Sequence, residues 1–307
     1  MIEKFEGIMK SHFLRVTSKS LYVCKLKKLM TLTGHDMNWI IRHPVELKEL
    51  ISDMDITDST KVSFVSAVIA YFIYSDNNLK EIEHELFKQW DDVKRYFNES
   101  IKERYGEMRP TTRQKLGFVD YEELQRVKER LDYGSERLLM TLYLDLPPIR
   151  ADYFNVVFKE LDDGDGNYII EDDELDKGIV GLLIINDYKT SKKYSRIEIP
   201  IPTTVMCDIK ECLKERRKSI YPEYESHLFL TSSGRPYKTR QSWTVWANTV
   251  VKDLLDNPSF SLTMFRHIYV SRPDLGLNTG PSTAERERLA KMMGHSTQTQ
   301  VQYQWRD

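Results

Sequence analysis

Apolar residues recur at helical spacing through the first hundred residues of the chain. The stretches 18–32, 63–76 and 79–105 all follow this pattern. The first has its apolar positions at Leu21, Cys24, Leu26, Leu29 and Met30, and the last at Ile82, Leu86, Trp90, Val93 and Phe97. A period near 3.6 residues is typical of an amphipathic helix. We therefore predict a helical N-terminal domain over residues 1–105.

The helical pattern stops at residues 106–118, GEMRPTTRQKLGF. This stretch contains two glycines, a proline and several basic residues but has no apolar periodicity. Such a composition is typical of a connecting segment. We predict a basic linker over 106–118 and a second domain over 119–307.

Two helical patterns open the second domain, at 120–131 and 134–144. Ser135 is expected to cap the second of them. Pro147 and Pro148 are expected to end it, because proline lacks the amide hydrogen that a helix interior needs.

Strand patterns follow the proline pair, at 167–170, 178–187 and 195–201. The last carries isoleucine at every second position, which is typical of a half-buried strand. The polar stretch 188–194 is expected to form a hairpin loop, and from 203 onward the pattern is mainly helical. The predicted fold is mainly α, with a small antiparallel β-sheet in the C-terminal domain.

The composition fits a folded protein of a reducing compartment. The chain has 307 residues, of which 40% are hydrophobic and 30% charged, so it can bury the core of one large or two ordinary domains. Its longest apolar stretch, 62–74, is too short for a membrane span, and the N-terminus lacks the apolar region of a secretory signal. Three cysteines without a CxxC pair favour neither a disulfide framework nor a zinc site. We expect an intracellular protein without a membrane or metal partner.

Charge is unevenly distributed along the chain. Residues 159–177 include nine acids and two lysines, a net charge of −7; since the whole chain carries −2, the remainder carries +5. Basic clusters occur at 25–28, 214–218 and 235–240. Such clusters fit nucleic-acid binding, but they are equally common on solvated surfaces.

The acidic stretch DDGDGN at 162–167 has the composition of a calcium-binding loop but not its spacing. An EF-hand loop needs oxygen ligands at positions 1, 3 and 5, glycine at 6 and glutamate at 12. With Gly166 at position 6, Leu161 takes position 1 and Asp172 position 12. With Gly164 at position 6, Leu161 takes position 3. Both registers fail, so we predict an acidic turn before a strand.

Basic and nucleophilic residues of the second domain occur in a suggestive order. One arginine follows the proline pair, a lysine lies in the expected hairpin loop, and a second arginine interrupts an apolar helical pattern at 262–271. A histidine then follows a glycine, and a tyrosine comes last. They are Arg150, Lys189, Arg266, His295 and Tyr303. An arginine among apolar residues needs a buried partner or a phosphate, whereas the adjacent His267 is interpreted as structural.

This order resembles the catalytic set of the tyrosine recombinases, the phage-type integrases. The segments PPIRADY, YKTSKKY and MMGHSTQTQ are similar to those of integrases from DNA viruses of eukaryotes and related mobile elements. The resemblance covers roughly residues 120 to 303, and it extends more weakly to the N-terminal helices. It implies a recombinase catalytic fold preceded by a helical, SAM-like core-binding domain.

The chemistry of metal-free phosphodiester cleavage explains why these residue types belong together. Two arginines can stabilise the charge that builds on the phosphate oxygens, since the guanidinium fork matches phosphate and keeps its charge. A tyrosine phenol, with a reference pKa of about 10, needs cationic surroundings to ionise and attack. A lysine can protonate the departing 5′ oxygen. The spacing favours Lys189 for that role, and Lys192 stays open as the alternative.

Local signals around His295 predict how it is placed. Ser282 and Glu285 form a capping box for a helix, and Gly294 is a natural stop at the C′ position. His295 should then lie just past a helix end. Ser296 or Thr297 should cap a further short helix that carries Tyr303.

The sequence departs from the family pattern at two places. The family usually has histidine three residues before the second arginine, where this chain has Thr263. Threonine can hydrogen-bond a phosphate but cannot act as a base at neutral pH, so deprotonation of Tyr303 would rely on the arginines, His295 or water. The acidic residue that often follows the first arginine at i+3 is replaced by Tyr153, with Asp152 one residue earlier.

The resemblance implies a site-specific DNA recombinase or integrase that forms a 3′-phosphotyrosine, without metal, ATP or another cofactor. Double-stranded DNA would be the partner, four copies would assemble on paired DNA sites, and the location would be the cytoplasm or nucleus of a host cell. Two alternatives stay open: type IB topoisomerase-like relaxation, and an inactive DNA-binding protein on the same fold. Expected DNA contacts are Lys19, Lys25, Lys28, Arg109, Arg113, Lys115, Lys192, Lys193 and Arg240.

Overall fold

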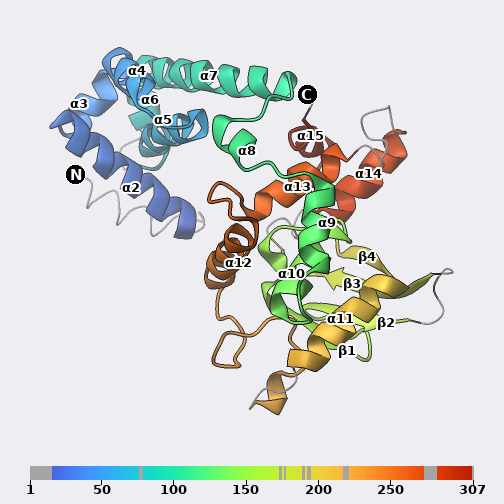
Figure 1. Cartoon of the computed structure of the whole chain (residues 1–307). Coiled ribbons are helices and arrows are strands. Elements are labelled where there is room, and N and C mark those ends of the chain that lie inside the picture. The colour runs from blue at the N-terminus through green and yellow to red at the C-terminus, as the bar shows by residue number, and fades with distance from the viewer. Residues whose placement is uncertain are drawn as a thin grey trace. The chain divides into compact units, whose positions relative to one another are not determined.

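The computed structural model divides the chain into two compact units, Met1–Glu107 and Met108–Asp307. It describes residues 16–75, 79–172, 175, 178–188, 191, 195–216, 221–272 and 282–305. The predicted fold class is confirmed: the described chain is mostly helical and holds one small sheet (Figure 1). No helix within these ranges is long and apolar enough to cross a membrane.

The described part of the N-terminal unit consists of helices. They are α2 (Val16–Thr33), α3 (Met37–Arg42), α4 (Pro44–Asp53), α5 (Asp58–Tyr74), α6 (Leu79–Ile82) and α7 (His84–Gly106). Side chains fix several of their starts, since Asp36 accepts from Trp39 N–H and Thr57 from Thr60 N–H. Such N-caps satisfy amides that have no partner inside a helix.

Helix α5 lies at the centre of this unit and packs against α2 and α7. Its apolar run is buried nearly all round, and Trp90 of α7 is fully buried with its indole N–H donating to Ile41 O at 3.0 Å. The helix predicted over 79–105 is interrupted at Glu83. Ile82, expected on its buried stripe, lies on the separate short α6 and is 70% exposed.

The described part of the second unit has α-helices on both sides of a β-region in the chain. They are α8 (Thr112–Leu116), α9 (Tyr121–Glu129), α10 (Ser135–Leu144), α11 (Thr203–Arg216), α12 (Arg240–Leu255), α13 (Leu262–Ser271), α14 (Thr283–Met292) and α15 (Thr297–Val301). Two 3₁₀ helices, η1 (Ala151–Asn155) and η2 (Pro222–Tyr224), complete the set. The stretch predicted as a linker, 106–118, thus contains α8, and from Met108 onward it belongs to this unit.

Four strands form one sheet in the order β1-β2-β3-β4. They are β1 (Val156–Lys159), β2 (Asn167–Glu171), β3 (Ile179–Ile185) and β4 (Ile197–Pro202). The β2–β3 and β3–β4 pairs are antiparallel as predicted, but β1 pairs parallel with β2, so the sheet is mixed. The prediction missed β1 because its four residues follow the proline pair without strand alternation.

The core of the second unit collects side chains from the sheet and from helices α9 to α13. Its most buried members include Leu139 of α10, Leu183 of β3, Trp243 of α12, and Phe229 in the segment before α12. The predicted acidic turn lies between β1 and β2. Its carboxylates pair with neighbouring cations: Asp163, for example, forms an ion pair with Lys159 at 2.6 Å.

The predicted N-cap at Ser135 is wrong. Gly134 occupies the N-cap position of α10, and Ser135 is the first helical residue. Glycine is itself tolerated at an N-cap, and α10 is held instead by burial of its apolar residues in the core.

Candidate active site

Arg150 is held at the start of η1 by the loop that carries the proline pair. Its backbone carbonyl accepts from the hydroxyl of Tyr143 at 3.0 Å, and the preceding Ile149 is 2% exposed. Tyr143 packs edge-on against Tyr153 and beside Phe265 of α13. The backbone at Arg150 is therefore fixed by core aromatics, while its side chain is partly exposed and lines a cleft.

Arg266 is the most deeply buried cation of the site, at 2% exposed. Its guanidinium donates to Pro148 O at 3.3 Å and Met293 O at 3.2 Å, so it joins the Arg150 loop to the end of α14. Its Nε is buried and finds no acceptor among the described residues. Burial lowers the pKa of Arg266, an effect opposed by Tyr303 and reinforced by Arg150, yet arginine stays charged at neutral pH.

Tyr303 lies over Arg266, whose guanidinium carbon is 4.7 Å from the centre of the phenol ring. The predicted short helix exists as α15, capped by Ser296 through Thr299 N–H. It ends at Val301, however, so Tyr303 lies in the turn after it and is held there by a bond from its amide to Gln300 O at 2.9 Å. The tyrosine therefore lies two residues past the end of α15 rather than on it.

His295 comes after a helix end built as predicted. The capping box between Ser282 and Glu285 starts α14. At the other end Gly294 has a φ of +67°, its amide bonds Lys291 O, and the amide of His295 bonds Ala290 O, each at 3.0 Å. These bonds form a Schellman motif, which needs a left-handed residue at C′.

The imidazole of His295 is buried beside Tyr303. It is 6% exposed, and the centres of the two rings are 5.5 Å apart. Burial, followed by the charge of Arg266, lowers the pKa of His295 to about 3. The ring is therefore neutral at physiological pH. Its Nδ1 lies 3.0 Å from Ser296 O and must donate to it, which leaves Nε2 as an acceptor without a partner in the described chain.

One cleft of about 230 Å³ brings four of the predicted residues together. They are Arg150, Thr263, Arg266 and Tyr303. Thr263 is exposed and lies three residues before Arg266 on α13, so both face the same side of the helix. Lys189 and Lys192, the two candidates for the general acid, lie outside the described residues, as does Lys193.

Asp152 is a buried acid close to the arginines of the site. It is 3% exposed and its carboxylate lies 2.6 Å from the guanidinium of Arg240 on α12. Burial raises the pKa of Asp152 although Arg240, Arg150 and Arg266 all lower it. The structure thus places an acidic residue against the arginines, at i+2 from Arg150.

A residue interpreted as structural, His267, contacts the tyrosine directly. Its Nδ1 lies 3.0 Å from Tyr303 O, its ring packs edge-on against the phenol, and Trp305 stacks on it at 4.3 Å. Nothing local in the sequence signals this contact, since 36 residues separate the two.

The other expected DNA contacts are spread over both units. On α2, Lys28 is exposed, whereas Lys25 lies 4.4 Å from the centre of the Phe64 ring and Lys19 is partly buried. In the second unit Arg109, Arg113 and Lys115 are exposed on or near α8.

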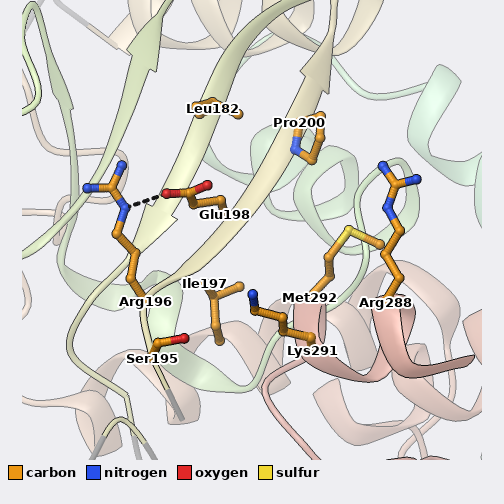
Figure 2. A pocket seen from close by; sticks show the side chains of 9 residues that line it. All are labelled: Leu182, Ser195, Arg196, Ile197, Glu198, Pro200, Arg288, Lys291 and Met292. Carbon is orange, nitrogen blue, oxygen red and sulfur yellow. Dashed lines mark ion pairs between the residues drawn. The ribbon is translucent and has the colours of Figure 1, made fainter. Parts of the chain in front are cut away.

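A second cavity, of about 430 Å³, lies between β4 and α14 and contains none of the predicted catalytic residues (Figure 2). It is larger than the cleft, but its Arg196 is neutralised by Glu198 at 2.8 Å and by Asp162 at 2.6 Å. Its remaining cations, Arg288 and Lys291, are exposed on α14. The candidate catalytic residues described above therefore lie outside this cavity.

Comparison with known proteins finds no matching family model and no matching curated protein. Among solved structures, the chain is similar to one described as the crystal structure of XerA recombinase. The identity is 11%, the TM-score is 0.44, and the alignment covers 100% of this chain and 93% of that chain. Similarity at this level does not define a family, so the function of the chain has to be inferred from the residues of the cleft.

Proposed function

We propose that this chain is a DNA strand-transferase that breaks and rejoins a phosphodiester bond through Tyr303. The proposal depends on one observation: two arginines lie close to the Tyr303 phenol in the same cleft. Arg266 lies against the ring, Arg150 lines the same cleft, and the buried Nε of Arg266 has no acceptor in the described chain. A cleft with two arginines beside a tyrosine suits an anionic substrate with an electrophilic phosphorus.

In the proposed reaction the phenol oxygen attacks phosphorus, the P–O5′ bond breaks, and a 3′-phosphotyrosine and a free 5′ hydroxyl form. The arginines stabilise the phosphate oxygens. The lysine of the 188–194 loop, Lys189 or Lys192, protonates the leaving oxygen. Thr263 cannot accept the phenol proton, and the lowered pKa of His295 makes its free Nε2 a weak base. The two arginines therefore have to stabilise the phenolate, while water or His295 takes the proton. Reversal by a 5′ hydroxyl rejoins the strand, and the bond energy is conserved.

The surface beside the cleft supports duplex DNA as the substrate. A groove on α12 shares Thr244, Asn248 and Ser261 with the catalytic cleft. Its lining includes Arg113 and Lys252. Contacts between such cations and DNA phosphates dominate the affinity of proteins for DNA and orient the duplex.

Covalent trapping tests the proposal. The chain is incubated with a random-sequence duplex pool, denatured and digested with nuclease, and the modified residue is mapped by mass spectrometry. Wild type should carry a nucleotide on Tyr303, and Tyr303→Phe should bind the pool with unchanged affinity but carry none. An adduct on Tyr303→Phe, or none on wild type, contradicts the proposal.

The outcome of strand transfer is tested on the trapped DNA. We propose a site-specific recombinase or integrase of a mobile or viral element, acting as a tetramer on two DNA sites. Exchange between two copies of the trapped sequence, with a four-chain complex in light scattering, is the expected result. Relaxation of any supercoiled plasmid by a single chain would instead identify a type IB topoisomerase-like activity.

A further inference from the structure

Three residues outside the predicted catalytic set form a chain of contacts around Tyr303, two from helices and one from the C-terminal segment itself. They are Gln114 on α8, His267 on α13 and Trp305 in the C-terminal segment. Gln114 Nε2 lies 3.0 Å from His267 Nε2, and His267 Nδ1 lies 3.0 Å from Tyr303 O. His267 is 3% exposed, whereas Gln114 and Tyr303 are partly buried.

The capping box of α8 fixes the orientation of Gln114. Its side-chain oxygen accepts from the amide of Thr111 at 2.8 Å and from the hydroxyl of Thr111 at 2.9 Å. With the oxygen occupied by two donors, the amide NH₂ faces His267 and must donate.

That orientation determines the tautomer of His267. Because Gln114 donates to Nε2, Nε2 carries the lone pair and Nδ1 carries the proton. The Nδ1–H then donates to the carbonyl oxygen of Tyr303. The chain of donors from Thr111 through Gln114 and His267 to Tyr303 therefore runs in one direction, with each partner oriented by the one before it.

Trp305, two residues after the tyrosine, makes further contacts that hold the same segment. Trp305 stacks on His267 with 23° between the planes, and its amide donates to Ser271 Oγ at 3.1 Å. Trp305 also contacts Phe118, which comes after α8. The turn with the phenol is thus anchored at its carbonyl and two residues later, against α8 and α13.

We infer that Gln114 and His267 are positioning residues that hold the Tyr303 turn so that the phenol lies over Arg266 in the cleft. The inference rests on the proposed function for its catalytic consequence but not for the contact itself. Displacing a nucleophile by about 1 Å can slow a reaction on the order of 100-fold. These hydrogen bonds, which we call the clamp, hold the Tyr303 backbone. Their loss should therefore slow the attack of the phenol on phosphorus more than it weakens DNA binding.

Two substitutions at His267 separate its hydrogen bonds from its ring. His267→Phe keeps the ring against Trp305 and removes both bonds, whereas His267→Asn places an amide donor near Nδ1 and removes the ring. The first should slow Tyr303 adduct formation by roughly 10- to 100-fold. The second should stay within about fivefold of wild type, because it restores the bond to the Tyr303 carbonyl.

A ligation assay distinguishes a loss of Tyr303 positioning from a general disruption of the active site. The probe is the trapped duplex with a 3′-(p-nitrophenyl phosphate) end, which a 5′-hydroxyl strand attacks to form the P–O5′ bond and release p-nitrophenolate. Tyr303 takes no part, while the arginines still act. His267→Phe and Gln114→Leu should ligate at near wild-type rates, and Thr112→Ala, on the exposed side of α8, should leave both reactions unchanged. Equal loss of cleavage and ligation would overturn the inference.

Hydrogen exchange of the 296–305 peptide tests the clamp without any DNA. His267→Phe should speed exchange of this peptide by at least about tenfold, and His267→Asn should change it little. If wild type forms no adduct, the proposed function fails and this measurement alone decides the clamp. Unchanged exchange in both His267→Phe and Gln114→Leu would overturn it, whatever the adduct yield.

Discussion

Arg266 has a structural role in the fold and, in the proposed reaction, a catalytic one. Two backbone carbonyls hold its terminal nitrogens, while Nε is buried with no acceptor in the described chain. A buried donor without a partner has a free-energy cost, which an incoming phosphate oxygen would remove. The same side chain therefore joins the Arg150 loop to the end of α14 and, in the proposed reaction, would offer a preorganised donor to the phosphate.

Replacing Arg266 should affect stability and reaction together. Arg266→Ala leaves the carbonyls of Pro148 and Met293 without donors, so the free energy of unfolding should fall by about 1–3 kcal/mol. Adduct formation should fall by at least about 100-fold. Urea unfolding and the trapping assay measure the two effects.

Arg137→Ala is the matched control for that measurement. Arg137 is partly buried and pairs with Asp208 at 2.9 Å in the same unit, away from the cleft. Its loss should lower stability by a similar amount and leave the adduct rate unchanged. If both variants lose the adduct equally, Arg266 has no special role in the reaction.

The buried His295 predicts that part of the stability of the protein depends on pH. Its folded pKa of about 3 lies below the ordinary value of 6.5, so the unfolded chain binds the proton more readily. Its contribution is complete above pH 6.5 and is lost as pH falls toward 3. Between pH 7 and pH 5 the loss from His295 is about 2 kcal/mol. Urea unfolding of His295→Asn should show a correspondingly smaller decrease; an identical decrease in both chains would contradict the burial effect.

At the scale of the elements, helix ends place two of the candidate residues. The capping box at Ser282, the stop at Gly294 and the cap at Ser296 were all predicted from the sequence and are confirmed. These helix ends could be predicted from the sequence because each cap is formed by residues that are close together in the chain. They position His295 at a helix end and Tyr303 one short helix later.

The contacts that the sequence did not predict are those between distant segments. The sequence did not indicate that β1 pairs parallel with β2, because the apolar pattern of a strand does not specify its partner or direction. The contacts of His267 with Gln114 and Tyr303 join residues 153 and 36 positions apart. No local periodicity encodes such proximity, so His267 in an apolar helix had the pattern of a core residue. The resemblance supplied the order of the candidate catalytic residues, and the structure brings Arg150, Arg266 and Tyr303 together in one cleft.

Gly294 provides a test of the helix end. Its φ of +67° is unfavourable for any other residue, and an added Cβ would lie 3.0 Å from Ile197 Cδ1. Gly294→Ala should lower the free energy of unfolding by about 1–2 kcal/mol and reduce adduct formation by moving His295. Gly34→Ala, at φ +71° with nothing within 4 Å of the new Cβ, measures the backbone strain alone. A larger loss at Gly294 than at Gly34 is expected; equal losses would mean that the Ile197 contact is harmless.

At the scale of the whole molecule, the net charge is small but acidic and basic residues are unevenly distributed along the chain. The net charge is −2, yet residues 159–177 carry −7 and the rest +5. The described part of the acidic segment forms β2 and the turn before it, where lysine and arginine neutralise several carboxylates. The groove on α12 lies on a different element and carries cations. A near-neutral protein can therefore still bind a polyanion on one surface.

That separation makes the salt dependence of DNA affinity the most direct whole-molecule test. Each cation that neutralises a phosphate contributes about 0.9 to the slope of log affinity against log salt concentration. Arg113→Ala and Lys252→Ala, both on the α12 groove, should each reduce the slope by about one. Fluorescence anisotropy with a random duplex, repeated over a salt series, measures it.

Arg240 should behave differently from these two, although it lines the same groove. It pairs with the buried carboxylate of Asp152, so Arg240→Ala should lower stability through an uncompensated buried acid as well as DNA affinity. Lys210→Ala, on α11 in an exposed ion pair with Glu171, should leave the slope unchanged. If removing Lys210 changes the slope as much as removing Arg113 and Lys252, DNA affinity depends on net charge alone and the α12 groove is not where the duplex lies.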